Sequence, residues 1–290
     1  MLILAVLYYQ LASKFALSFE AFPQPKGMLF LNPYVGYSWY NRAIGGGKFN
    51  ENEKISQAYG GLFFEYGLTK KITIGADITL AETWTSVNGR LSGRVAEKSF
   101  ALSQIQLLAR YNLFRDGGSS ISVATYLFTP SFGYGTGILD TYGSYNQWKH
   151  EISIEFGYKF KTGGSITANF GYRAQYNNPQ NRDVMRFKLT YYRPIAYGFS
   201  LYATLVKQAY INKGNNVFGF AQNGSFRLDA FDFITNGGYV ALDLFLAKEI
   251  TKGKYIVFAY TRSLQSKIFA NKGMNMGFNA FWIEAWFFIK

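Results

Sequence analysis

Hydrophobic and polar residues alternate along two neighbouring stretches between residues 58 and 84, AYGGLFFEYGLTKKITIGADITLAETW. In the second stretch the even positions from Ile72 to Leu80 are apolar, and the odd positions between them are small or polar. Successive side chains of a strand point to opposite faces, so the pattern predicts strands with one apolar and one polar face. The segment Gly67-Leu68-Thr69-Lys70-Lys71 lies between them and is short enough for a tight hairpin.

The length of these strands separates two interpretations. Each is about twelve residues long, whereas strands of soluble proteins average about five or six residues. A tilted strand needs roughly nine to eleven residues to cross a bilayer. A single such strand would also suit a soluble β-sandwich, so the choice depends on whether the pattern repeats.

The same alternation recurs along the rest of the chain, in residues 29–39, 100–113, 120–132, 148–160, 166–176, 185–192, 199–211, 239–249, 255–265 and 281–289. Five short turns, near Thr69, Asp116, Gly163, Pro194 and Lys252, alternate with longer polar loops such as 41–54, 86–98 and 212–237. The longest of these, 212–237, is expected to fold partly over one mouth. Short periplasmic turns, long external loops and an even strand number are typical of outer-membrane barrels. We therefore predict an all-β, up-and-down antiparallel transmembrane β-barrel of about twelve strands, with both chain ends on the periplasmic side.

The N-terminus predicts export. Leu2 to Tyr9 form an apolar core, and Ala16-Leu17-Ser18 provides small residues at the positions that a signal peptidase reads. An inner-membrane anchor is the alternative, but a segment that contains Gln10 and Lys14 is a poor membrane span. The predicted domains are a signal peptide, residues 1–18, and a single transmembrane barrel, residues 19–290.

Composition agrees with a membrane barrel. Aromatic residues make up 19% of the chain and charged residues 16%, whereas a soluble domain carries about 25% charge. The net charge of +13 comes from basic residues scattered over loops and strand ends, which does not indicate a nucleic-acid partner. Contact with anionic lipid headgroups, and a lumen that favours anions, is one interpretation; a compositional drift toward lysine is the other. With no cysteine and one histidine, we expect neither metal nor cofactor.

Three short motifs suggest a family. They are the lead-in Gln24-Pro25-Lys26-Gly27, the hairpin Glu65-Tyr66-Gly67-Leu68-Thr69 and the strand Ile72-Thr73-Ile74-Gly75-Ala76. Together they resemble XagA-like proteins, which are allied to the outer-membrane family named for a phenol-degradation meta-pathway. The resemblance implies a bacterial outer-membrane barrel with suspected solute passage and no catalytic residues. The last strand, with Trp286, Phe287 and Phe288, also resembles the signal that the barrel-assembly machinery reads.

Candidate catalytic groups do not form a recognisable set. One known twelve-stranded outer-membrane architecture is a phospholipase that needs a serine two residues after its histidine, but Ile152 follows His150 at that spacing. His150 is better interpreted as an interfacial residue beside Trp148. Acidic residues available at the external rim have spacings that specify no chemistry: Asp140, Glu151, Asp229 and Asp232. We therefore expect that the protein is not an enzyme.

The inward faces of the predicted strands carry charged residues at similar distances from the short turns. At about 3.3 Å per residue they form one belt below mid-height: Glu65, Asp77, Arg110, Glu155, Arg173, Arg186, Lys188, Asp243 and Glu284. Eight-stranded barrels are filled and sixteen-stranded barrels hold a water channel, so twelve strands lie between these cases. The charges either pair across the interior and plug it, or form the constriction of a narrow pore.

The predicted function is a narrow outer-membrane channel for passive passage of small polar or aromatic solutes. Six tyrosines are expected to line its path: Tyr34, Tyr59, Tyr126, Tyr192, Tyr202 and Tyr260. The alternative is a non-conducting structural or surface-interaction barrel of the cell envelope. The expected partners are outer-membrane lipid and lipopolysaccharide, the barrel-assembly machinery and small solutes, with the barrel a monomer or a loose oligomer.

Overall fold

Twelve long strands and one three-residue strand make up the regular structure of the described chain. The computed structural model describes residues 21–40, 54–89, 93–129, 132–134, 148–176, 183–210, 239–266 and 278–290. The strands are β1 Leu29–Tyr40, β2 Lys54–Gly67, β3 Ile72–Gly89, β4 Gly93–Asp116, β5 Ser119–Phe128, β6 Phe132–Tyr134, β7 Lys149–Lys159, β8 Ser165–Gln175, β9 Val184–Pro194, β10 Phe199–Tyr210, β11 Tyr239–Thr251, β12 Lys254–Ser266 and β13 Phe278–Ile289.

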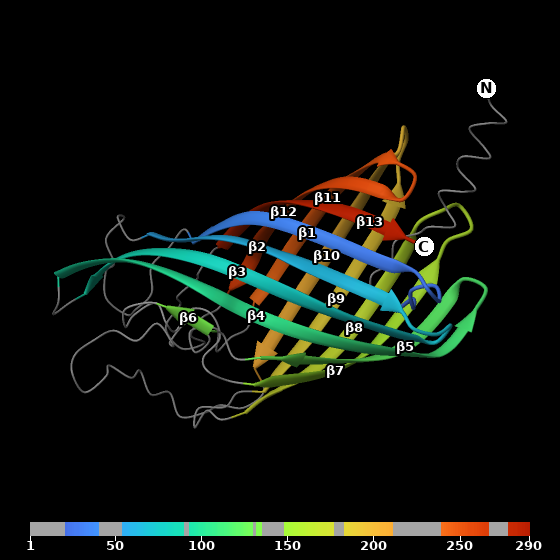
Figure 1. Ribbon diagram of the computed structural model, residues 1–290, viewed down its shortest axis with the longest axis horizontal. Coiled ribbons are helices and arrows are strands. Elements are labelled where there is room, and N and C mark those ends of the chain that lie inside the picture. The colour runs from blue at the N-terminus through green and yellow to red at the C-terminus, as the bar shows by residue number, and fades with distance from the viewer. Residues whose placement is uncertain are drawn as a thin grey trace.

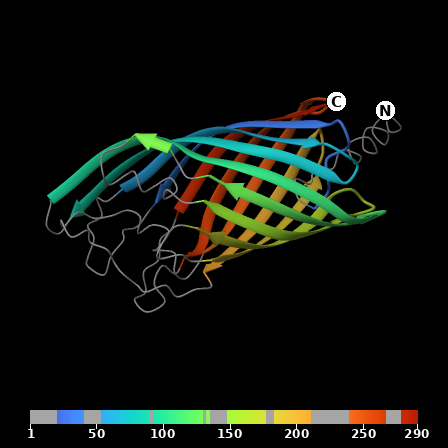
Figure 2. The same cartoon turned by 60° about the horizontal axis from the view of Figure 1, so that its bottom comes forward.

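The long strands form one closed antiparallel wall (Figures 1 and 2). Each pairs with its neighbours in the chain, with β5 pairing directly to β7. The first and last strands pair from Leu29↔Ile289 to Tyr40↔Phe278, which closes the cylinder. The short β6 pairs with β4 at residues 100–102 in the same register as β5, and so continues the line of β5 along β4. Closure leaves the wall without an open edge, as a membrane interior requires. The predicted all-β, twelve-stranded barrel is confirmed.

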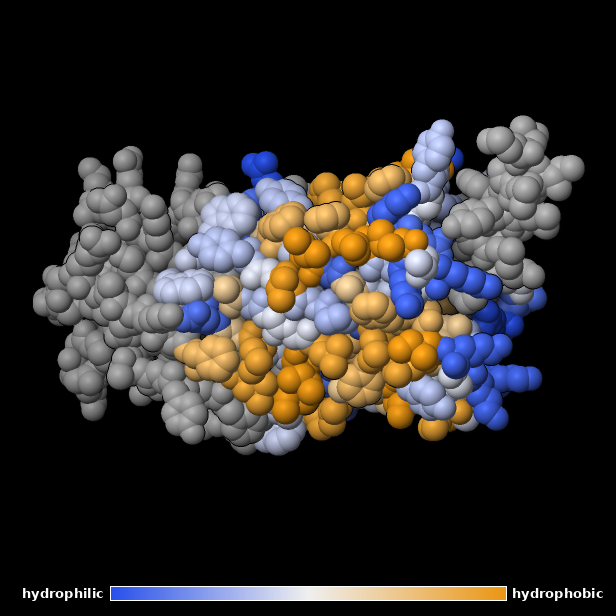
Figure 3. Space-filling model, turned by 45° about the horizontal axis from the view of Figure 1, so that its top comes forward, coloured by the Kyte–Doolittle hydropathy of each residue, from blue (hydrophilic) through white to orange (hydrophobic). Residues whose placement is uncertain are grey.

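The outer face is apolar around the middle of the barrel. Outward side chains such as Ile78, Leu107, Ile154, Phe170 and Leu246 are each about half exposed. On the face that Figure 3 shows, hydrophobic residues gather around the middle of the barrel. Their inward neighbours are mostly polar or small, as in β7, where buried and exposed positions alternate strictly. Among the described residues, no helix is long and apolar enough to cross a membrane.

The five predicted short turns are confirmed and share one end of the barrel with the start of β1 and the C-terminus (Figure 1). In the β2–β3 turn the Thr69 hydroxyl accepts hydrogen bonds from the backbone N–H groups of Lys71 and Ile72. We call this end the turn end and the opposite end the loop end. Exposed basic side chains gather at the turn end, and we call this set the basic rim: Lys26, Lys70, Lys71, Arg115, Lys161, Arg193, Lys252, Lys254 and Lys290.

Two boundaries differ from the prediction. Residues 86–98 were predicted as a loop, but β3 continues to Gly89 and β4 begins at Gly93, with Ser86↔Ala96 and Val87↔Val95 paired. Hydrogen-bond pairing across this hairpin continues although its sequence is polar and charged, so the hairpin extends past the other strands (Figure 1). The strand predicted for 120–132 ends at Phe128. The predicted signal peptide 1–18 and the 212–237 loop lie outside the described residues.

A charged substitution on the outer face tests the membrane-spanning geometry. Ile154 lies at the centre of β7 and faces outward with 46% of its surface exposed. We expect Ile154→Arg to lower the free energy of unfolding from phospholipid vesicles by about 2–4 kcal/mol, the cost of arginine at the bilayer midplane.

The matched control is Leu68→Arg in the β2–β3 turn, where Leu68 is also outward and 48% exposed. Near the interface the same substitution costs only about 0–1 kcal/mol. Equal losses at the two positions, measured by urea titration of the folded barrel in vesicles, would contradict a central apolar band in contact with hydrocarbon.

Candidate functional site

All nine charged residues of the predicted belt face the interior. Each occupies one of the alternate positions of its strand whose side chains point into the barrel. They do not form one continuous network. Glu65, Arg110 and Glu155 are completely or almost completely buried, whereas Asp77, Arg173, Arg186, Lys188 and Asp243 keep part of their surface exposed. The belt therefore divides into a buried group, called the closed level below, and charges that keep some exposure.

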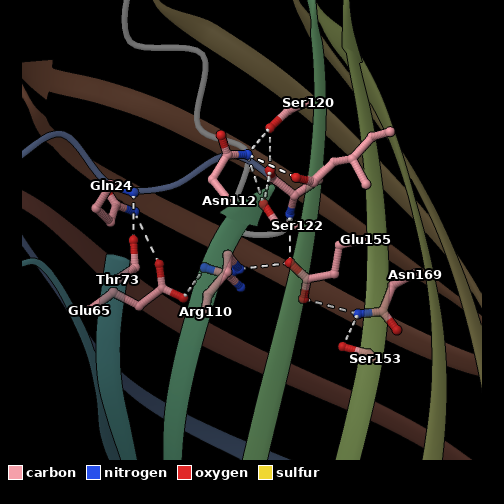
Figure 4. Close-up of polar contacts among 12 residues, drawn as sticks. Gln24, Glu65, Thr73, Arg110, Asn112, Ser120, Ser122, Ser153, Glu155 and Asn169 are labelled. Atoms are coloured by element: carbon pink, nitrogen blue, oxygen red, sulfur yellow. Dashed lines mark hydrogen bonds and ion pairs between the residues drawn. The ribbon is translucent and has the colours of Figure 1, made fainter. Parts of the chain in front are cut away.

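The closed level centres on Arg110 of β4 (Figure 4). Its Nη1 donates to Glu65 Oε1 of β2 at 3.0 Å, and its Nε donates to Glu155 Oε2 of β7 at 2.7 Å. Glu155 also accepts hydrogen bonds from the Tyr126 hydroxyl and the Asn169 amide. Buried charges are tolerated when they are paired and hydrogen-bonded in this way. We call Glu65, Arg110 and Glu155 the interior triad.

The segment that precedes β1, residues 21–27, binds to this triad from inside the barrel. The backbone N–H of Ala21 donates to Glu155 Oε2 at 2.9 Å, and the Gln24 side chain donates to Glu65 Oε2 at 3.1 Å. The Gln24 backbone N–H donates to the Thr73 hydroxyl of β3 (Figure 4). We call residues 21–27 the lead-in. It passes along the inner face of β2, β3, β5 and β7 at the turn end.

Further hydrogen bonds hold the end of the lead-in that lies against β5. The hydroxyls of Ser120 and Ser122 both donate to the Ala21 carbonyl, at 2.6 and 2.8 Å. The Asn112 amide in turn donates to both serine hydroxyls (Figure 4). Ala21, Phe22 and Gln24 are all buried, so the lead-in is an integral part of the interior and not a tether outside it.

Small inward residues make room for the lead-in. A Cβ added to Gly67 would overlap the backbone oxygens of Pro25 and Gln24, and one added to Gly157 would overlap the Phe22 ring. Lys159 Nζ lies 4.7 Å from the centre of the same Phe22 ring, a cation–π geometry. The sequence analysis used Gln24-Pro25-Lys26-Gly27 only as a family motif and did not predict that this segment lies inside the barrel. The inward glycines and serines near the turns of β2, β5 and β7 are the signal that could have indicated it.

A second charged cluster lies toward the loop end. Glu151 of β7 is fully buried and binds two arginines, Arg173 Nη2 at 2.8 Å and Arg186 Nη2 at 2.5 Å. The Arg173 guanidinium also lies 4.5 Å from the centre of the Phe128 ring. Glu151 is four residues from Glu155 along β7, about 13 Å nearer the loop end. The prediction placed Glu151 at the external rim and left it out of the belt, so the arginines' partner was missed.

The remaining acidic members are bound separately. Tyr34 donates to Asp77 at 3.0 Å, and the hydroxyl of Thr261 donates to Asp243. Glu284 accepts hydrogen bonds from Asn32, Trp282 and Trp286. Lys188 faces inward from β9, opposite Asn169 of β8 in the pairing register. These residues lie on several sides of the lumen.

Aromatic side chains fill the half of the turn end that the lead-in does not occupy. The buried cluster consists of Phe30, Tyr192, Tyr202, Ala247, Tyr255, Val257 and Trp286, with Phe63, Phe245 and Phe288 packed against it. Tyr192 and Tyr202 stack with ring centres 4.5 Å apart, and Tyr202 meets Trp286 edge to face at 5.4 Å. Tyr34 and Tyr59, nearer the loop end, are only partly buried, with ring centres 6.4 Å apart.

One predicted lumen tyrosine faces the wrong way. Tyr260 was expected in the lumen, but it shares the outward face of β12 with the exposed Phe258 and pairs with the exposed Phe281 of β13. The inward face of β12 instead carries Tyr255, Val257, Ala259 and Thr261, all buried. The Tyr260 hydroxyl donates to Asn279 at 2.9 Å. Both faces of this strand contain apolar and aromatic residues, so alternation alone does not identify its inward face.

His150 also lies on the outer face, next to the exposed Trp148. Its Nε2 is 2.7 Å from the Thr125 hydroxyl of β5. The inward Ser153 points to the other face of β7, where Asn169 contacts it at 3.4 Å. The structure therefore does not bring these two residues together.

Removing the charge of Arg110 tests the interior triad. We expect Arg110→Met to lower the free energy of unfolding by about 3–5 kcal/mol, because two buried carboxylates lose their cation. The triple variant Glu65→Gln/Arg110→Met/Glu155→Gln removes all three charges and should recover most of that loss. The measurement is reversible denaturant unfolding in vesicles. If Arg110→Met costs less than about 1 kcal/mol, the triad does not stabilise the fold.

Comparison with known proteins gives the fold. No protein-family model and no curated protein sequence matches the chain. Among solved structures, it is similar to an outer membrane channel from Pseudomonas putida F1, with 14% identity, a TM-score of 0.65, and coverage of 94% of this chain and 99% of that one. It is also similar to the NanC porin, with 9% identity, a TM-score of 0.58, and coverage of 89% of this chain and 98% of that one.

At these identities the likeness shows the fold alone. The chain is a membrane-spanning β-barrel of the outer-membrane type, and the predicted outer-membrane location follows from this fold.

Proposed function

We propose that the protein is a narrow channel of the bacterial outer membrane for passive passage of small polar or aromatic solutes. One observation carries the proposal. Some inward charged side chains toward the loop end, namely Asp77, Arg173 and Arg186, keep part of their surface exposed although Glu151 beside them is buried, whereas the triad at the turn end is buried under the lead-in. In the proposal, these partly exposed side chains line a vestibule that narrows at the lead-in.

The vestibule combines polar and aromatic groups. Arg173 and Arg186 keep 17% and 19% of their side-chain surface exposed, and Tyr34 and Asp77 are partly exposed on the far side of the lumen. Charged side chains with aromatic neighbours can contact small polar and aromatic solutes alike. In the proposal, the nine-residue belt acts in two parts, with the triad holding the lead-in and the other charges facing solutes.

A non-conducting structural or surface-interaction barrel is the alternative. The near-complete burial of Arg110, Glu65 and Glu155 favours it, since these residues close their part of the interior. The two functions differ in one measurable property, the flow of ions through a single barrel. We further propose that the barrel has no catalytic activity, works as a monomer, and contacts lipopolysaccharide and the barrel-assembly machinery. A place among XagA-like proteins belongs to the same proposal.

Displacing the lead-in tests the channel. A methyl group at Gly67 would overlap the backbone of Pro25 and Gln24, so Gly67→Ala should push the lead-in from the wall. We expect a single-channel conductance in planar bilayers roughly twofold or more above wild type, since conductance rises with open cross-section. Ser120→Ala/Ser122→Ala removes two hydrogen bonds to Ala21 and should act in the same direction.

Gly60→Ala in the same strand is the control, because the nearest atoms to its added Cβ are at 3.4 Å. It should leave conductance unchanged. If wild type and both lead-in variants are equally sealed, the non-conducting alternative is correct and the channel proposal fails.

Opposite charges in the vestibule should have opposite effects on ion selectivity. Arg173→Gln removes a partly exposed cation, while Arg186 continues to pair with Glu151. We expect the anion-to-cation permeability ratio to fall roughly twofold in this variant and to rise in Asp77→Asn. Reversal potentials in a salt gradient measure both. Shifts of the same sign in the two variants would show that these side chains do not face the permeating ions.

A further inference from the structure

The charge on the outside of the barrel is distributed unevenly between its two ends. The basic rim has nine exposed cationic side chains, and Asp116 is the exposed acidic residue beside them among the described residues. At the loop end, the described outward charges are balanced: Lys207 and Arg262 against Glu82 and Asp183. Among the described residues, the excess of outward positive charge is therefore concentrated at the turn end, where Figure 3 shows hydrophilic residues beyond the apolar band.

The rim lies at the level expected for lipid phosphates. Exposed apolar side chains border it on the side of the band, among them Leu113, Ile195 and Ile250. Basic and aromatic side chains just outside an apolar band are the groups that contact headgroups in membrane proteins. Because short turns of outer-membrane barrels face the periplasm, the facing lipid layer is the periplasmic leaflet.

One sector of the rim has a defined structure. The β9–β10 and β11–β12 turns are neighbours, because Phe199 of β10 pairs with Lys248 of β11. Lys248 Nζ lies 4.5 Å from the centre of the Phe199 ring and donates to the Tyr197 carbonyl, which joins the two turns. Tyr197 has a left-handed backbone, φ 51°, and is 91% exposed. A tyrosine held in that conformation and exposed beside the apolar band is placed to enter a lipid interface.

Arg193 and Lys254 lie on either side of this joined pair of turns. Arg193 pairs with Leu201 and Leu201 with Leu246, so β9 and β11 are two strand spacings apart, about 10 Å. Lys254 lies on β12, the next strand, and faces outward with Ile256 and Phe258. Because Leu246 pairs with Phe258, Lys254 lies three strand spacings across and four residues along from Arg193, about 20 Å between Cα atoms. The two cations therefore border the sector from opposite sides, with Lys248 and Lys252 between them.

We propose that the sector formed by Arg193, Tyr197, Lys248, Lys252 and Lys254 is a binding site for an anionic phospholipid of the periplasmic leaflet. The cations bind the phosphate, and Tyr197 and Ile195 contact the upper acyl chains. Lipopolysaccharide, the other anionic lipid of an outer membrane, lies at the loop end and does not reach this site. The proposal does not depend on whether the barrel conducts.

The test compares two double variants with equal loss of charge. Arg193→Gln/Lys254→Gln removes one arginine and one lysine from the site, and Lys207→Gln/Arg262→Gln removes the same pair from the loop end. Both are exposed positions on the outer face, so neither variant leaves a buried group without a partner. Phosphatidylglycerol and phosphatidylcholine are offered in equal amounts to the folded barrel in detergent, and bound lipid is measured by native mass spectrometry.

Wild type and the loop-end variant should retain phosphatidylglycerol over phosphatidylcholine. The site variant should lose about tenfold or more of that preference, since each basic residue near an anionic surface contributes about fivefold. Equal retention in all three proteins would overturn the proposal. Equal loss in both variants would also overturn it, because binding would then follow total charge. A loss confined to the loop-end variant would place the lipid site at the other end.

Discussion

The interior depends on one buried guanidinium. Arg110 lies between Glu65 and Glu155, all three almost completely removed from solvent. Two carboxylates against one cation leave a net negative charge, and the lead-in offsets it with backbone and side-chain N–H donors from Ala21 and Gln24. Strands β2, β4 and β7 and the lead-in are thus held by one set of hydrogen bonds, and residues 21–27 become part of the barrel interior.

The two halves of the turn end are filled in different ways. On β2, β3, β5 and β7 the inward residues are small, such as Gly67, Ser120 and Gly157, and the lead-in occupies the space they leave. On the strands from β9 to β13 the wall fills its own half with large rings, including Tyr202 and Trp286. Eight-stranded barrels are filled by side chains and sixteen-stranded barrels hold a water channel, so a twelve-stranded wall lies between these cases. The partly exposed charges, such as Arg173 and Asp77, lie toward the loop end.

The barrel fold and the inward position of the charges could be predicted from the sequence. Three features could not, each for a physical reason. Strict alternation in β7 and β8 and glycine-containing turns identified the barrel and the inward charges. Tyr260 was assigned to the wrong face because β12 is apolar on both faces. The 86–98 segment was predicted as a loop because its composition is polar, yet antiparallel pairing continues through it. The lead-in was missed because alternation describes neighbours along one strand, whereas its contacts join residues up to 134 positions apart.

A cross-link inside the barrel tests the central claim most directly, because the chain contains no cysteine of its own. Ser122 of β5 donates to the Ala21 carbonyl where the lead-in lies against the wall, whereas Ser200 faces inward from β10, on the far half of the wall. The account predicts that Ala21→Cys/Ser122→Cys forms a disulfide in the folded barrel and that Ala21→Cys/Ser200→Cys does not. Failure of the first pair to oxidise, or equal oxidation of both pairs, would contradict a lead-in held against β5 and the interior triad.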